Sequence, residues 1–279
     1  MIRIIADSTC NLPADILQQY NILTVPLFIQ FGQQTFREGV DITSRQFFEM
    51  IEAKGELPTT SQPPPAEFAR LYQQVHEAGD SALVITVTSK HSGTYQSALL
   101  ATSLVPEAEI EIFDSRSISL GTGWLILEAA RSAVKGMNKD TILSRLCAIR
   151  DQMTLYLTPG TVKYMLMSGR VSSLQGALAS VLKIKPIITI NNGLLDVKAK
   201  VRTMNKALDR MVAMIEDAFQ DLPLNVAIVH VQCEEDGKRF LNRTREILNV
   251  RESLFADLTP SLAAHGGPGG LGILAFPAD

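Results

Sequence analysis

A hydroxyl-rich turn carries the residue types best suited to hold a small anion. It reads Ser89-Lys90-His91-Ser92-Gly93-Thr94-Tyr95, and it lies between an apolar run at 83–88 and a helix-forming run at 96–101. A strand that feeds a helix through such a turn leaves unpaired backbone N–H groups at the positive end of the helix dipole. Together with the Ser and Thr hydroxyls, these groups predict a site for a phosphate, a sulfate or a carboxylate.

A second segment of the same kind is Thr60-Ser61-Gln62-Pro63, in a predicted loop at 59–65. Its prolines lead into a predicted helix at 66–78 and equally fit an ordinary helix start. Ser92 likewise fits a plain helix cap, a role that contributes roughly 1 kcal/mol. Capping and anion binding use the same geometry, so a capping role does not exclude a ligand.

Ser92 could alternatively be a catalytic nucleophile instead of an anion ligand, but the sequence around it does not match the known motif. A hydrolase nucleophile elbow reads G-x-S-x-G, and here Lys90 stands where the first glycine belongs. His91 is adjacent in sequence, which is not how a base meets a serine in known triads. Both observations make anion binding the first hypothesis. A serine hydrolase or acyltransferase that uses Ser92 with His91 or His265 is the second hypothesis. Asp7 does not fit a phosphoaspartate motif, because Thr9 stands at the expected second aspartate.

The glycines near the C-terminus match a dinucleotide fingerprint by letter, as Gly267-x-Gly269-x-x-Gly272. That motif requires a strand before the glycines and a helix after them, and we expect no such frame here. Such glycines are instead predicted to let backbone segments pack closely. His265 stands at their start and is a candidate partner for an anion.

The elements that must position these residues alternate between strand and helix in the first half. Strands are predicted at 2–6, 23–30, 83–88 and 110–113, with a small hairpin near 30–42 and a capping box at Thr43 and Gln46. This order predicts a mainly parallel sheet with helices on both faces. Polar tips follow three of the strands, and in such a sheet they gather at one edge, where ligands bind.

The second half predicts a different α/β domain with a mixed sheet. Asn191-Asn192-Gly193 is a strong hairpin signal between strands at 185–190 and 195–201. A long amphipathic helix is expected at 205–219, and strands at 225–231 and 252–258 follow. We place the boundary near residue 155, which gives domains at 1–155 and 156–279.

Composition excludes several classes of protein. The 279 residues are 46% apolar and 20% charged, with a net charge of −3, so no basic face for nucleic acid is expected. No signal peptide and no apolar stretch of about 20 residues is seen, so any membrane contact would be transient. Three widely spaced cysteines predict a reduced, cytoplasmic protein. No His, Cys, Asp or Glu cluster has metal-ligand spacing, and neither metal nor cofactor is expected.

These motifs, in this order, resemble the DegV family of bacterial fatty-acid-binding proteins, and the likeness runs from residue 2 to 278. They are Thr60-Ser61-Gln62-Pro63, Ser92-Gly93-Thr94-Tyr95, Asp114-Ser115, Ser168-Gly169-Arg170-Val171, Lys185-Pro186-Ile187, Gly193, Arg202 and His265-Gly266-Gly267-Pro268-Gly269.

The resemblance implies two α/β domains with a long-chain fatty acid, such as palmitate, buried between them. It implies that Thr60, Ser92 and His265 bind the carboxylate, and we expect Ser61, Gly93 and Thr94 to support them. It also implies a carrier without catalysis of its own, which presents the acid to a separate fatty-acid kinase for phospholipid synthesis. Arg170 and Arg202, in turn-like stretches, are candidates for docking that kinase.

Two positions depart from the family pattern. His91 stands where the family often has Leu or another apolar residue, and Pro65 replaces a small polar residue. A titratable group at 91 either alters head-group contacts or points to solvent, and Pro65 predicts a stiffer helix start.

Overall fold

The computed structural model describes residues 1–167 and 184–278. The chain divides into two compact units, Met1–Asp151 and Gln152–Asp279. None of the helices within the described residues combines the length and apolar composition that a bilayer-spanning segment needs.

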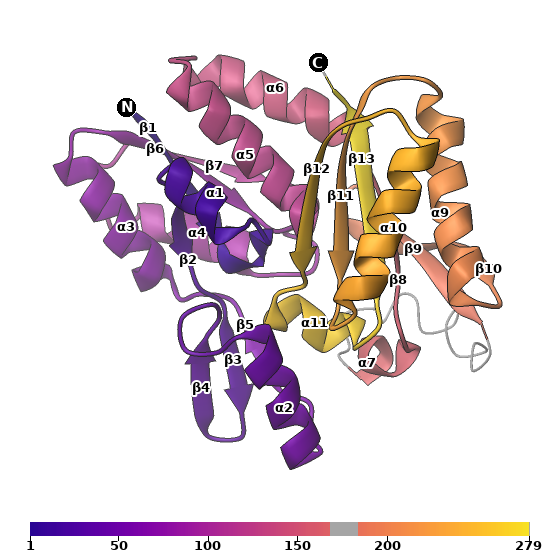
Figure 1. Ribbon diagram of the computed structural model, residues 1–279. Coiled ribbons are helices and arrows are strands. Elements are labelled where there is room, and N and C mark those ends of the chain that lie inside the picture. The colour runs from indigo at the N-terminus through magenta and orange to yellow at the C-terminus, as the bar shows by residue number, and fades with distance from the viewer. Residues whose placement is uncertain (168–183, 279) are drawn as a thin grey trace. The chain divides into compact units, whose positions relative to one another are not determined.

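Four parallel strands form the main sheet of the first unit (Figure 1). Across the sheet they are β2 (Leu23–Val25), β1 (Ile2–Asp7), β6 (Ser81–Thr86) and β7 (Ile110–Asp114). The surrounding helices are η1 (Ser8–Cys10), α1 (Ala14–Gln19), α3 (Pro65–Glu77), α4 (Thr94–Thr102), α5 (Leu120–Val134) and α6 (Lys139–Gln152).

Burial along β6 shows that both faces of this sheet are covered. Adjacent residues of a strand point to opposite faces, and Leu83 and Val84 are both fully buried. On one face, Val84 joins a core cluster with Phe68 and Tyr72 of α3. The predicted parallel sheet with helices on both faces is therefore confirmed.

A second, smaller sheet in the first unit corrects two predictions. The expected strand at 23–30 is two strands, because β2 ends before Pro26 and β3 (Phe28–Phe31) belongs to the small sheet. Proline lacks the N–H that a continuous ladder needs. β3 forms the predicted hairpin with β4 (Gln34–Arg37), and α2 (Ser44–Lys54) follows.

The other correction concerns the segment at 59–65, which is not all loop. Its first residues form β5 (Thr59–Ser61), which pairs with β3 in antiparallel register, so that Thr60 lies opposite Ile29. The threonine and serine of this segment favour a strand as readily as a turn.

The second unit contains the predicted mixed sheet. Its order is β10 (Leu194–Val201), β9 (Lys185–Asn191), β8 (Thr154–Thr158), β13 (Leu271–Pro277), β11 (Leu224–His230) and β12 (Val250–Asp257). Only β11 and β12 pair in parallel among these neighbours. The helices described in this unit are α7 (Val162–Met167), α9 (Met204–Phe219), α10 (Glu234–Ile247) and α11 (Pro260–Gly266).

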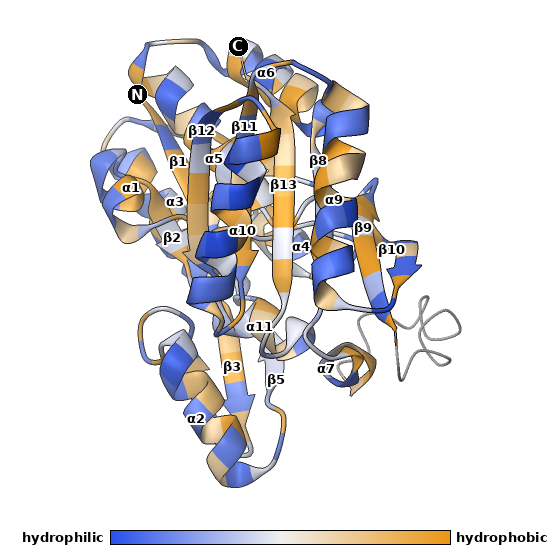
Figure 2. Ribbon diagram, turned by 45° about the vertical axis from the view of Figure 1, so that its right-hand side comes forward, coloured by the Kyte–Doolittle hydropathy of each residue, from blue (hydrophilic) through white to orange (hydrophobic). Residues whose placement is uncertain are grey.

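Amphipathic helices cover this sheet. Met211 and Ile215 of α9 and Phe240 of α10 are buried in one cluster with sheet residues such as Val226. Much of the visible side of α10 is hydrophilic, whereas β13 is largely hydrophobic (Figure 2). The β9–β10 hairpin turns at Asn192 and Gly193, which adopt the left-handed φ values of +48° and +84° that this signal predicts.

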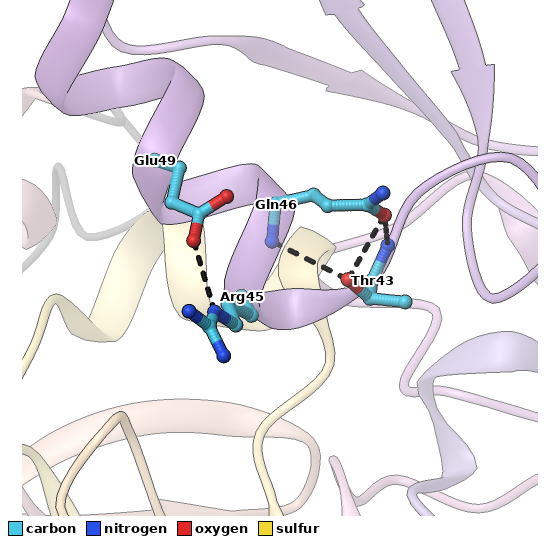
Figure 3. A network of polar contacts seen from close by, with 4 residues as sticks. All are labelled: Thr43, Arg45, Gln46 and Glu49. Carbon is cyan, nitrogen blue, oxygen red and sulfur yellow. Dashed lines mark hydrogen bonds and ion pairs between the residues drawn. The ribbon is translucent and has the colours of Figure 1, made fainter.

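The N-terminus of α2 supplies a test of local stability. Thr43 Oγ1 accepts from the Gln46 N–H at 3.3 Å, and Gln46 Oε1 accepts from the Thr43 N–H at 3.0 Å, so the predicted capping box is confirmed (Figure 3). In the same helix, Arg45 and Glu49 form an exposed ion pair at 2.9 Å.

We expect Thr43→Ala to lower the free energy of unfolding by about 1 kcal/mol, because it leaves the Gln46 N–H of the first turn without its side-chain acceptor. Glu49→Ala, the matched control, should cost less than about 0.5 kcal/mol because exposed ion pairs are screened by water. Urea unfolding of both variants measures the difference. Equal losses would contradict this assignment.

Candidate ligand-binding site

The turn between β6 and α4 presents its hydroxyls at the start of a helix. The Ser92 and Thr94 hydroxyl oxygens are 2.8 Å apart, and Ser92 Oγ accepts from the Thr94 N–H at 3.3 Å. Gly93, not Ser92, is the N-cap residue of α4. The Ser92 hydroxyl thus supports the first N–H of the helix from one position further out, where the positive end of the helix dipole favours an anion.

Neighbouring strands hold this turn in place. The Ser89 hydroxyl and N–H both donate to the carboxylate of Asp114, at the end of β7, at 2.6 and 3.2 Å. The Thr88 N–H donates to the Ser117 carbonyl at 2.9 Å. The polar tips of β6 and β7 therefore meet at one edge of the parallel sheet, as the sequence predicts.

The carboxyl group of Asp7, at the end of β1, supports the residues that lead into the same turn. This carboxyl group is fully buried and accepts from the Val87 N–H at 2.7 Å and from the Thr9 N–H at 2.9 Å. Burial raises the pKa of the Asp7 carboxyl above its usual range, although these hydrogen bonds oppose the shift. A fully buried and hydrogen-bonded carboxyl acts as a support for the turn.

Two contacts join the Thr60 segment to the Ser92 turn within the first unit. The buried Ser97 hydroxyl, in the first turns of α4, donates to the carbonyl of Pro63. The Gln62 side chain covers the α-carbon of Gly93 so closely that a Cβ there would stand 3.0 Å from Cδ and Nε2 of the amide. The strand that carries Thr60 and the turn that carries Ser92 are therefore held together.

Gln62 and Ser97 make this junction, and Asp114 supports the turn from β7. The sequence assigned no individual role to any of these three residues. Gln62 lies inside the Thr60–Pro63 motif, and Asp114 is one of the polar strand tips, so both carried a signal. Ser97 looks like any small residue of a helix, and nothing in its sequence context predicts its bond to Pro63.

The remaining predicted site residues belong to the second unit. His265 lies in the last turn of α11 and is partly buried. Its role at the carboxylate stays a prediction. Arg202 is exposed in the turn between β10 and α9, whereas Arg170 lies outside the described residues. Across residues 1–167 and 184–278, no group of three or more His, Cys, Asp or Glu side chains is placed to hold a metal.

The C-terminal glycines pack backbone closely, as predicted. A Cβ on Gly267 would stand 2.6 Å from the Tyr164 ring, and one on Gly160 would stand 1.8 Å from the Pro268 carbonyl oxygen. The strand before and helix after that a dinucleotide motif needs do not frame these glycines, as expected, because α11 precedes them and β13 follows. That order, helix then strand, is the reverse of the dinucleotide-binding motif.

The parallel sheet of the first unit and the mixed sheet of the second place the chain in a class of two-unit α/β proteins. A family model described as "Uncharacterised protein, DegV family" matches residues 1–278. A DegV domain-containing protein of Caldanaerobacter subterraneus is 32% identical over 273 residues, which cover 98% of this chain and 97% of that protein. The chain belongs to the DegV family, which confirms the resemblance seen in the sequence.

Solved structures agree with this assignment. A fatty-acid-binding DegV family protein from Thermus thermophilus has a TM-score of 0.94 and 27% identity, with 99% of each chain covered. A stearic acid-binding protein from Eubacterium ventriosum has a TM-score of 0.91 and 25% identity, with 99% of this chain and 98% of that chain covered. The predicted fold is thereby confirmed.

Asp7 gives the site a pH-dependent contribution to stability. Because its pKa is higher in the folded chain than in the unfolded one, the folded chain binds more protons from about pH 4 upward, and stability from this group falls as the pH rises. The free energy of unfolding of wild type minus that of Asp7→Asn should therefore decrease from pH 4 toward neutrality. Urea unfolding at stepped pH measures it, with the exposed Asp15→Asn as control. A difference that grows with pH would contradict the assignment.

Proposed function

We propose that this protein is a cytoplasmic carrier that binds a long-chain fatty acid and holds its carboxylate at Thr60 and Ser92. The junction of Gln62 with Gly93 carries the proposal, because it brings together two hydroxyl-bearing segments at a helix start. The solved relatives described as fatty-acid-binding support the ligand class. Three free cysteines fit a reducing compartment.

The tail and the head group of a fatty acid contribute unequally to the free energy of binding. A C16 acid has about 15 carbons beyond its carboxylate, and at about 0.8 kcal/mol per buried CH₂ they contribute on the order of 10 kcal/mol. A hydrogen bond to the charged carboxylate adds about 1.5–3 kcal/mol. The tail therefore sets most of the affinity, and Thr60 and Ser92 set orientation and depth. We propose that His265 is a further partner of the carboxylate.

Removal of both hydroxyls tests the carboxylate site. We expect Thr60→Ala with Ser92→Ala to weaken palmitate or oleate binding about tenfold or more, because two donors to a charged group are lost. Lipid extraction with mass spectrometry and titration with added acid measure the change. Thr59→Ala with Ser103→Ala is the matched control, since both of these side chains are exposed and Thr59 points to the other face of β5.

Three results would contradict the carrier proposal. One is that neither co-purified nor added fatty acid binds the wild type. Another is that the double variant binds as well as the control. The third is covalent labelling of Ser92 by a fluorophosphonate probe together with ester hydrolysis, which would favour the hydrolase or acyltransferase hypothesis.

We further propose that the bound acid is presented to a separate fatty-acid kinase, which phosphorylates the carboxylate for phospholipid synthesis, with Arg202 and Arg170 in the docking surface. Arg202 is exposed, and a guanidinium suits an acidic protein face. No catalytic step by the carrier itself is needed in this scheme.

Charge reversal at Arg202 tests the docking surface. Arg202→Glu should lower the rate of acyl phosphate formation by the kinase at least tenfold and leave fatty-acid affinity unchanged, because the changed side chain acts only on the partner. The control is Arg251→Glu, an exposed arginine on β12. Loss of both phosphorylation and binding would indicate misfolding, and an unchanged rate would remove Arg202 from the docking surface.

A further inference from the structure

Gln62 is the residue at which the two halves of the candidate site touch. Its Cδ, Nε2 and Oε1 atoms would lie 3.0, 3.0 and 3.3 Å from a Cβ on Gly93, so the whole amide covers that residue. Gly93 stands between Ser92 and Thr94, whose hydroxyls are 2.8 Å apart. The amide therefore covers the residue that joins the two hydroxyl-bearing residues in the chain.

The amide group of Gln62 is also available. The side chain is exposed, and within the described residues no protein group forms a hydrogen bond with it. An amide supplies two N–H donors at Nε2 and an acceptor at Oε1. If close contact with Gly93 were its only role, an apolar side chain of the same length would serve equally well.

A carboxylate requires more donors than two hydroxyls provide. Its two oxygens offer about four lone-pair sites, and a charged group that leaves water is stabilised only when those sites are paired. The hydroxyls of Thr60 and Ser92 supply one donor each. Gln62 Nε2, packed against Gly93, would add a neutral donor without the desolvation cost that a lysine or arginine would bring.

We propose that the Gln62 amide is an additional head-group ligand, which donates from Nε2 to the fatty-acid carboxylate beside Thr60, Ser92 and the proposed partner His265. This inference rests on the proposed function. It also gives a reason for glycine at position 93, where φ is −79° and a side chain would be tolerated by the backbone. A side chain there would push the amide away from the carboxylate.

Gln62→Met tests the inference, since methionine keeps the length and the apolar contact with Gly93 but removes both donors. We expect palmitate affinity to fall about tenfold, the effect of losing one hydrogen bond to a charged group. Affinity for hexadecanol, which has the same chain and no carboxylate, should stay within about twofold. Gln74→Met, on the exposed side of α3, is the matched control and should change neither affinity.

The outcomes separate this inference from the function on which it rests. Equal losses of affinity for palmitate and hexadecanol would overturn it, because Gln62 would then affect the shape of the site without binding the carboxylate. Unchanged palmitate affinity would also overturn it. In either case, a loss of palmitate binding in Thr60→Ala with Ser92→Ala would leave the proposed function standing. Restoration of palmitate affinity by Gln62→Asn would show that the amide, and not the length of the side chain, is required.

Discussion

The bond from the Ser97 hydroxyl to the Pro63 carbonyl is the constraint on which the site depends. It ties the first turns of α4 to the segment that follows β5, and it does so in a buried place where an unpaired carbonyl would be costly. The close approach of Gln62 to Gly93 lies next to it in the chain. Packing of α3 against α4, with the Tyr72 hydroxyl donating to the Ala98 carbonyl at 3.0 Å, supports the same arrangement.

Support for the turn comes from buried or paired carboxyl groups. Asp7 holds the backbone of Val87, and Asp114 holds Ser89. Burial also raises the pKa of the Cys10 thiol to about 12, so this cysteine stays protonated in the core. Hydrogen bonds to these carboxyl groups therefore fix the backbone on which the Ser92 turn is built.

Sequence reasoning predicted the elements better than their junctions. Alternating strands and helices, the capping box at Thr43 and the Asn192-Gly193 hairpin were predictable because each depends on residues close together in the chain. The split at Pro26 had a visible signal, whereas β5 depends on pairing with β3 some thirty positions away. The contacts of Ser97 and Gln62 were not predictable, although Gln62 lies in a quoted motif, because these contacts arise only once α3 and α4 pack side by side.

The placement of Thr60 on one sheet and Ser92 on the edge of another has a dynamic consequence. A ligand held by both would act as a crosslink between the small sheet of β3, β4 and β5 and the parallel sheet of the same unit. Opening the small sheet would then require breaking the ligand's head-group bonds as well as the sheet's own. Amide hydrogen exchange in β3 and β5 would slow when such a ligand is bound, and the small sheet would report on occupancy of the proposed site.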